Sequence, residues 1–225
     1  RVQYQSVDKV LVVTVLVAPG MPDIETTPIS IVRGLTPGAH VAVEGILMGY
    51  AYYGTTSKQG FYIGDESSQI VIYVTDKSSL ERVQPGEKVI VSGDLTLSTR
   101  HGLSIDNAVI EFQDYQNHPF YEDVIESIAL TDLLLFTVAD NITSRVFRVR
   151  VRVEVTTGMY SNVYLHDADD DSISVILYST GSATSNAVAR ALEGQTLEVY
   201  MTLISRRYAD PGANDSWRAE MLAAV

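Results

Sequence analysis

Three arginines at alternate positions could bind a chain of phosphates. Arg148, Arg150 and Arg152 lie in the segment 146–156 (VFRVRVRVEVT), where valine takes most of the intervening positions. Alternate residues of a β-strand share one face about 6.6 Å apart, which is comparable with the phosphate spacing of a single-stranded nucleic acid. Further candidates in this half of the chain are Arg206, Arg207, Tyr208 and Arg218. The alternative is a solvated strand face whose arginines pair with carboxylates on neighbouring strands.

A second set of candidates occurs in the first half, in the segments 50–59 (YAYYGTTSKQ) and 98–102 (STRHG). Aromatic rings that stack on bases, next to a few cations, are what single-stranded nucleic acid requires, and the same residues would suit a sugar ring. These residues are Tyr50, Tyr52, Tyr53, Lys58, Arg100 and His101. The alternative is that they are ordinary surface residues of a β protein.

An acidic run offers a weak calcium candidate. Asp167, Asp169 and Asp171 occur in the segment 167–171 (DADDD), and carboxylate oxygens at alternate positions could bind Ca²⁺. The run lacks the glycine and the terminal glutamate of an EF-hand loop, so a solvated acidic turn is favoured.

Evidence for catalysis is missing from the sequence. It has no cysteine, its histidines have no metal-ligand spacing, and it contains no nucleophile elbow, phosphate loop or dinucleotide fingerprint. The histidines are His40, His101, His118 and His166. Asp65 and Asp167 occupy matching positions in the two halves and are interpreted as turn formers. We therefore expect a protein that is not an enzyme and needs no cofactor.

The elements that would position these residues occur twice. Each half begins with a long strand of alternating residues, at 40–49 in the first half and 146–156 in the second. Two short strands and a helical connection come next, and then a second long strand and a last strand. The clearest matches are GFYIGD at 60–65 with NVYLHD at 162–167, and QIVIYV at 69–74 with SISVILY at 172–178. The pattern predicts an all-β chain of two tandem five-stranded Greek-key barrels, each with a short helix.

Segments outside the repeats complete the predicted organisation. We divide the chain into an N-terminal strand and lead-in (1–37), a first barrel (38–113), a linker (114–126) and a second barrel (127–225). Residues 25–35 and 127–136 are expected to pack beneath the first and second barrel respectively. The linker is short, so we expect the barrels to touch. The apolar strand Val7–Val17 has no counterpart in the second half and could pair with a sheet edge, in its own chain or in a neighbour.

The first half resembles the OB-fold modules of bacterial extracellular nucleases and cell-surface lipoproteins. The resemblance lies in the order of its motifs: a glycine-bearing strand, then G-F-Y-I-x-D, I-x-V-Y-V and P-G-x-x-V-x-V-x-G. Residues 38–113 carry the resemblance well and 144–225 more loosely, since Tyr200 replaces the glycine matched by Gly93 and Asp169–Asp171 enlarge a turn. The resemblance implies a nucleic-acid-binding module that accompanies a catalytic domain, which this sequence lacks. It also implies an extracellular or cell-surface location.

The charge restricts how such a module could bind. The formal net charge is −12 and 46% of the residues are hydrophobic, so a folded, acidic protein must gather its cations to bind a polyphosphate.

No segment reaches the roughly 18 apolar residues of a membrane-spanning helix, and the start at Arg1 suggests a processed chain or part of a larger protein. Our leading hypothesis is non-catalytic binding of single-stranded nucleic acid. The alternative is a structural or adhesive surface module that binds protein or carbohydrate and assembles through the N-terminal strand.

Overall fold

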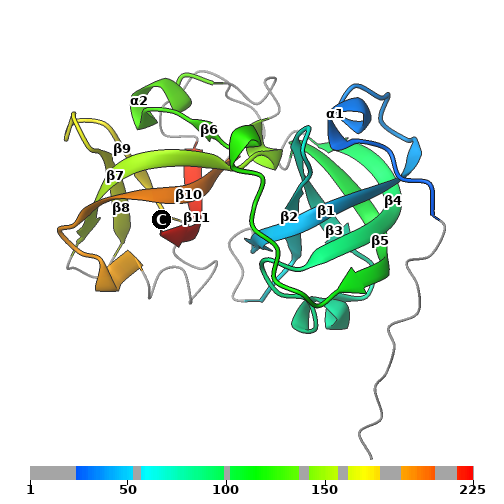
Figure 1. The fold of residues 1–225 in the computed structure, drawn as a ribbon. Coiled ribbons are helices and arrows are strands. Elements are labelled where there is room, and N and C mark those ends of the chain that lie inside the picture. The colour runs from blue at the N-terminus through cyan, green and yellow to red at the C-terminus, as the bar shows by residue number, and fades with distance from the viewer. Residues whose placement is uncertain are drawn as a thin grey trace, which may run out of the picture.

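The computed structural model describes most of the chain after residue 23 (Figure 1). The described residues are 24–52, 57–98, 102–136, 142–156, 162–177, 189–205 and 217–224. The predicted strand Val7–Val17, and any strand exchange that it would mediate, lies outside them.

The first half folds into a closed five-stranded barrel with the strand order β1-β2-β3-β5-β4. Its strands are β1 (His40–Ala51), β2 (Gly60–Gly64), β3 (Gln69–Val74), β4 (Lys88–Ser98) and β5 (Gly102–Asp114). The pairing of β3 with β5 is parallel, and the other pairings are antiparallel. A short 3-10 helix, η1 (Lys77–Glu81), connects β3 to β4. Alternating apolar residues of these strands fill one buried core, as the period of two predicts.

The second half repeats this architecture in a looser form. Its strands are β7 (Phe147–Val155), β8 (Val163–Asp167), β9 (Ser174–Ile176), β10 (Thr196–Ser205) and β11 (Trp217–Ala224). They form a sheet in the order β11-β10-β7-β8-β9, and one parallel bridge between Leu177 and Ala219 joins its two edges. This bridge stands where β3 pairs with β5 in the first half. The short strand β6 (Glu126–Ser127) adds to β7 and makes the sheet six-stranded. The predicted all-β fold of two OB-like barrels is confirmed.

The residue of β10 that matches Gly93 is Met201, one residue after the Tyr200 that the sequence comparison indicated, because each lies seven residues after the turn glycine, Gly86 or Gly194. A Cβ atom at Gly93 would lie 2.7 Å from the carbonyl oxygen of Asp106, so β4 approaches β5 more closely than a side chain permits. Met201 fills the core of the second barrel at this position, whereas Tyr200 points away from that core and contacts Phe120 of the linker. The closed barrel thus has a glycine where the looser barrel has a methionine.

A short helix precedes each barrel and is held by the same aspartate of the repeat. The Asp65 carboxylate accepts a hydrogen bond from the backbone N–H of Ile29 (2.7 Å), the first residue of α1 (Ile29–Val32). The Asp167 carboxylate accepts bonds of 3.1 Å from the N–H and the hydroxyl of Thr131 in α2 (Leu130–Leu133). Each aspartate also accepts backbone N–H bonds from the turn that follows it. The prediction that both are turn formers is therefore confirmed, and each also anchors the lead-in segment of its own barrel.

The two barrels pack against each other through a third apolar cluster, which includes Met48 and Tyr62 of the first barrel and Tyr200 and Ile204 of the second. A polar contact lies at one end of this interface. The buried Gln69 side chain donates to the carbonyl of Val124 (2.8 Å) and accepts from the N–H of Val146 (2.6 Å). These bonds connect the first barrel to the linker, which contains η2 (Glu122–Val124), and to the start of the second barrel.

Arg33 extends the same contact. Its guanidinium donates to the carbonyl of Gln69 (2.9 Å) and to the hydroxyl of Ser144 (2.8 Å) in η4 (Ile142–Ser144). Burial, aided by the charge of Arg145, lowers the pKa of Arg33 to about 10. These bonds connect the residue that follows α1 with η4, and so join the lead-in segment of the first barrel to the start of the second. Of the helices in the described ranges, none has the length and hydropathy to cross a membrane.

Candidate nucleic-acid interface

The second barrel presents one sheet face to solvent, over β7, β8 and β9. The valines of β7 point into the barrel, so the arginines between them point outward. Strand pairing places Arg152 opposite His166, and Tyr164 opposite both Glu154 and Ile176. We call this surface the open face; it comprises Arg148, Arg150, Arg152, Glu154, Tyr164, His166 and Ile176. Its aromatic rings, Tyr164 and His166, have centroids 6.3 Å apart.

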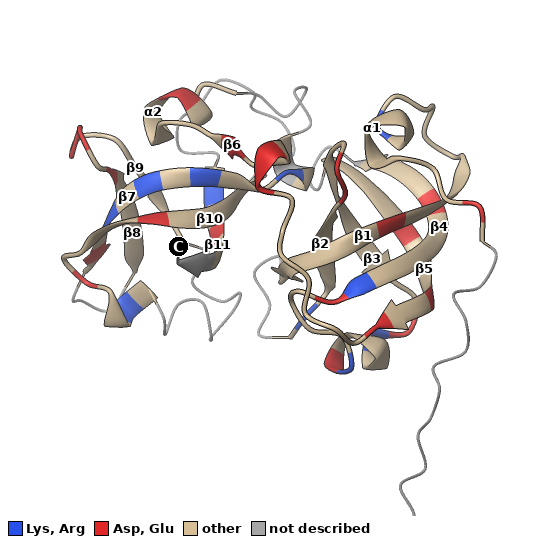
Figure 2. Ribbon diagram, in the orientation of Figure 1, with Lys and Arg blue, Asp and Glu red and all other residues tan. Residues whose placement is uncertain are grey.

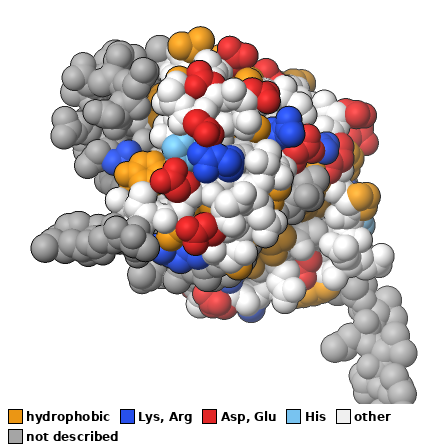
Figure 3. Space-filling model, turned by 90° about the vertical axis from the view of Figure 1, so that its left-hand side faces the viewer, with side chains coloured by type: hydrophobic (Ala, Val, Ile, Leu, Met, Phe, Trp, Pro, Cys, Tyr) orange, Lys and Arg blue, Asp and Glu red, His pale blue; other side chains and the backbone are white. Residues whose placement is uncertain are grey.

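Each arginine of the open face has a carboxylate partner. Arg148 Nε lies 2.7 Å from Glu198 Oε2, and this hydrogen bond raises the pKa of Arg148. Arg150 lies 3.8 Å from Asp169, and Arg152 lies 2.9 Å from Asp171. Basic and acidic residues therefore lie near one another on the strands and turns of this barrel (Figure 2), and the space-filling view of this side shows no continuous basic area (Figure 3).

The acidic turn between β8 and β9 supplies two of these partners. Asp169 and Asp171 face the arginines of β7, and Asp167 holds α2. Burial, the largest single effect, acts to raise the pKa of Asp167, but the hydrogen bonds from Asp169, Thr131 and Asp170 together outweigh it, so the pKa is lowered. Within the described ranges, no three histidine, aspartate or glutamate side chains are arranged to hold a metal ion. The turn therefore serves the arginines of β7, and the suggested Ca²⁺ site remains only a sequence pattern.

Both ring nitrogens of His166 face oxygen atoms in the open face, and Nδ1 makes the hydrogen bond. Nε2 lies 2.7 Å from Glu154 Oε2, and Nδ1 lies 2.9 Å from the carbonyl oxygen of Asp171. The ring is thereby held beside Tyr164 and next to Arg152. This combination of ring faces and a guanidinium was not predicted for β8. The repeat could have indicated it, because Tyr164 aligns with Tyr62.

Two first-barrel candidates support the fold locally. The Tyr50 hydroxyl donates to the carbonyl of Val83 (2.5 Å), and Lys58 Nζ lies 3.9 Å from the centre of the Tyr50 ring. Lys58 also donates to the carbonyl of Leu80 in η1 (3.1 Å). Tyr50 and Lys58 thus hold η1 against β1. Tyr53, Arg100, His101, Arg206, Arg207 and Tyr208 lie outside the described residues, and Arg218 lies on β11, where it donates to the carbonyl of Trp217.

The second barrel covers the corresponding sheet face of the first barrel. Tyr62 of β2 and Val71 of β3 are completely buried in the interface cluster together with Ile204 of β10. Tyr62 and Tyr164 occupy the same repeat position, yet one is covered and the other partly exposed. An OB barrel binds ligands on its second and third strands, so only the second barrel keeps this face open.

A buried carboxyl group lies at this interface, at the opposite end from Gln69. Glu220 of β11 is 3% exposed, and its carboxylate oxygens lie 3.2 and 3.4 Å from the backbone N–H of Tyr52, which donates to them. Burial raises the pKa of Glu220 to about 8, although the Tyr52 hydrogen bond acts in the other direction. Tyr52, a predicted ligand contact, is therefore part of the contact between the barrels.

No protein-family model and no curated protein sequence matches this chain. Among solved structures, the p202 HIN1 domain in complex with a 12-mer double-stranded DNA has 11% identity and a TM-score of 0.46, with 84% of this chain and 96% of that chain covered. A replication protein A heterotrimer bound to single-stranded DNA has 10% identity and a TM-score of 0.30, with 89% and 69% covered. Similarity of this extent carries no conclusion about function, and the resemblance to bacterial nuclease modules stays a prediction.

Proposed function

We propose that this chain is a non-catalytic binding module whose ligand is single-stranded nucleic acid, bound on the open face of the second barrel. The observation that supports it is the position of Tyr164 and His166 beside Arg150 and Arg152 on an uncovered OB sheet face. A base would stack on Tyr164, and the neighbouring phosphates would pair with the two arginines.

The carboxylate partners of these arginines are compatible with binding. The side chains of Arg150 and Asp169 are 63% and 88% exposed, and exposed ion pairs contribute about 0–1 kcal/mol. A phosphate can therefore replace Asp169 or Asp171 at small cost. Base stacking on an aromatic side chain contributes about 1–3 kcal/mol per base and requires no basic surface. Affinity would thus depend more on Tyr164 than on the arginines.

Fluorescence anisotropy with a labelled oligodeoxythymidine, at low and moderate salt, tests the proposal. We expect Tyr164→Ala to weaken binding about tenfold or more, whereas Tyr164→Phe keeps the ring and the affinity. Two phosphate contacts predict a slope of about −1.4 for log K against log salt concentration. Lys77→Gln on η1 is the charge control and should leave binding unchanged.

A charge-release variant makes the test sharper. Asp169→Asn with Asp171→Asn removes the partners of Arg150 and Arg152, so the affinity for the oligonucleotide should increase. If neither this variant nor the wild type binds at low salt, nucleic acid is not the ligand. Reduced affinity in this variant would also contradict the proposed phosphate contacts.

The complete pairing of the arginines favours a second candidate, a structural or adhesive module that binds protein or carbohydrate. Binding to a glycan array, measured for the wild type and for Tyr164→Ala, would separate this candidate from nucleic-acid binding. A sugar would stack on the same ring, but its affinity would not depend on salt. A secreted or cell-surface location is part of either proposal and is supported by the sequence resemblance alone. Fractionation of the source cells with an antibody against the chain would test it.

A further inference from the structure

The last strand of the first barrel is longer than its partner on one side. β5 pairs with β3 only as far as Ala108, where the N–H of Thr75 donates to the Ala108 carbonyl (3.0 Å). Beyond that point, Val109–Asp114 pairs with β4 alone. We call this segment the free edge of β5, because no other strand of the described chain pairs with it.

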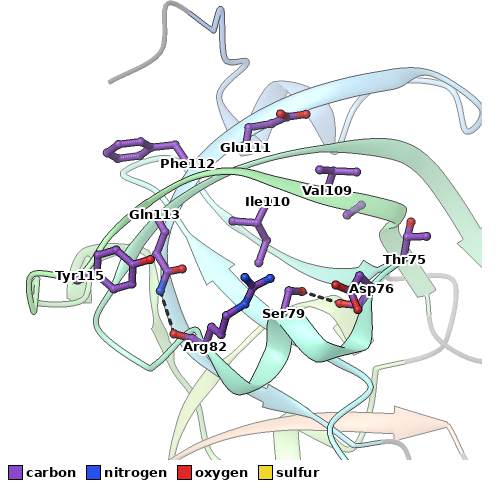
Figure 4. Close-up of a pocket in the computed structure, with 11 residues that line it drawn as sticks. Thr75, Asp76, Ser79, Arg82, Val109, Ile110, Glu111, Phe112, Gln113 and Tyr115 are labelled. Carbon is purple, nitrogen blue, oxygen red and sulfur yellow. Dashed lines mark hydrogen bonds between the residues drawn. The ribbon is translucent and has the colours of Figure 1, made fainter. Parts of the chain in front are cut away.

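A cleft of about 450 Å³ lies between the free edge and η1 (Figure 4). Thr75 and Asp76 lie at one end of it. At the other end, Gln113 of β5 donates through its side chain to the carbonyl of Arg82 (3.0 Å). Ile110 points from β5 toward Arg82. The volume is within the range of about 300–1,000 Å³ that ligand pockets occupy.

Arg82 brings a positive charge into the cleft, within electrostatic range of Asp76. Its side chain is exposed, lines the cleft and makes no hydrogen bond or ion pair with any described residue. Asp76 lines the same cleft, but its carboxylate accepts hydrogen bonds from the N–H and the hydroxyl of Ser78. The arginines of the open face, in contrast, all have carboxylate partners. In a chain of net charge −12, such an arginine is suited to a negatively charged group of a ligand.

We propose that the free edge of β5 binds an extended peptide as an additional strand, and that an acidic side chain of this peptide pairs with Arg82. The backbone of Val109–Gln113 supplies hydrogen bonds to the added strand, which gives affinity without dependence on sequence. Specificity comes from the side chains. Val109 is 52% exposed and Tyr115 is 73% exposed, so both offer apolar surface beside the edge, and Arg82 selects a carboxylate.

The charges of the cleft favour a peptide over a nucleic acid. Among the described residues that line it, Arg82 is the only cation, and Asp76 and Glu111 are acidic. A peptide with one acidic residue can place that residue at Arg82 and neutral residues elsewhere. A nucleic acid carries one phosphate per nucleotide and would place further charges near the two carboxylates.

A random octapeptide library displayed on phage tests the proposal on the whole chain, and the result does not depend on whether the open face binds nucleic acid. Selection against the wild type should enrich β-branched peptides with one aspartate or glutamate. A synthetic peptide from the enriched set should bind about tenfold more weakly to Arg82→Gln, and equally to Lys77→Gln, which removes the same charge from η1 outside the cleft. Changing the acidic residue of the peptide to its amide should cause the same loss in the wild type.

Hydrogen exchange locates the bound peptide without a variant. The amides of 109–113 should exchange more slowly when the peptide is present. The proposal is wrong if no enriched peptide distinguishes the wild type from Arg82→Gln, if the enriched peptides lack acidic residues, or if protection appears elsewhere. It is also wrong if oligodeoxythymidine binds at the free edge of β5. In that case Arg82→Gln would lower the affinity for the oligonucleotide, and the oligonucleotide would protect the same amides.

Discussion

Glu220→Gln should change the pH dependence of folding, because this carboxyl group is buried between the barrels. Gln has nearly the same shape, and its carbonyl oxygen can accept the hydrogen bond of the Tyr52 N–H. It has no charge at any pH. The substitution therefore removes the titration and leaves the packing of the interface in place.

The sign follows from the two states of Glu220. Its pKa is about 8 in the folded chain, against an ordinary 4.5, so the folded state keeps the proton that the unfolded state releases. The contribution of Glu220 to the free energy of unfolding is fully present below pH 4.5 and is lost as the pH rises toward 8. With 1.36 kcal/mol for each pH unit, the loss is at most about 5 kcal/mol.

Urea unfolding between pH 5 and pH 9 measures this difference. At pH 5 the wild type and Glu220→Gln should have free energies of unfolding within about 1 kcal/mol of each other, and at pH 9 the variant should be more stable by several kcal/mol. Glu66→Gln is the matched control, because Glu66 is exposed and has no ion pair or hydrogen bond within the described structure. Parallel pH profiles for wild type and Glu220→Gln would refute the assignment of Glu220 as a protonated group in the interface.

Three further substitutions test the packing of the barrels. Asp167→Asn should lower the free energy of unfolding by about 1–3 kcal/mol at pH 7, because it weakens the hydrogen bonds to Thr131. The pKa of Asp167 is lowered in the folded state, so the difference between variant and wild type should shrink as acid protonates the wild-type carboxylate. Gly93→Ala should cost about 1–3 kcal/mol by overpacking of β4 against β5, whereas Gly34→Ala, whose Cβ would lie at an ordinary 3.4 Å, should cost little; thermal unfolding of both checks this. Gln69→Ala leaves two backbone groups of the barrel contact without partners, and calorimetry should show a lower melting temperature or two separate transitions.

The strands were predictable because their signals are local. The alternating residues of 40–49 and 146–156, and the repeated short strands, specify both faces of each barrel without knowledge of its neighbours. The packing of α1 and α2 beneath the barrels also followed from their equivalent places in the repeat.

The state of the arginines was not predictable, because it depends on a turn that is distant in sequence. Arg150 and Asp169 are 19 residues apart and meet only because β8 pairs with β7. The sequence left paired and unpaired arginines as alternatives, and the structure has them paired. Glu220 shows the same limit: between Arg218 and Leu222 on one face of β11 it has the pattern of a solvated residue, but the first barrel covers it.

The covering of one repeat by the other predicts how many ligands the chain binds. Nothing in the sequences GFYIGD and NVYLHD distinguishes Tyr62 from Tyr164 as ligand contacts, so the repeat alone would allow one site in each barrel. Tyr62 is completely buried beneath β10 and β11, and Gln69 and Glu220 hold the barrels together at the two ends of this contact. If the open face binds single-stranded nucleic acid, short oligonucleotides should therefore saturate at one per chain in sedimentation at concentrations well above the dissociation constant. Two per chain would mean that the first barrel also binds. In that case Tyr62→Ala should change oligonucleotide binding, and the view that the contact between the barrels excludes ligand would be wrong.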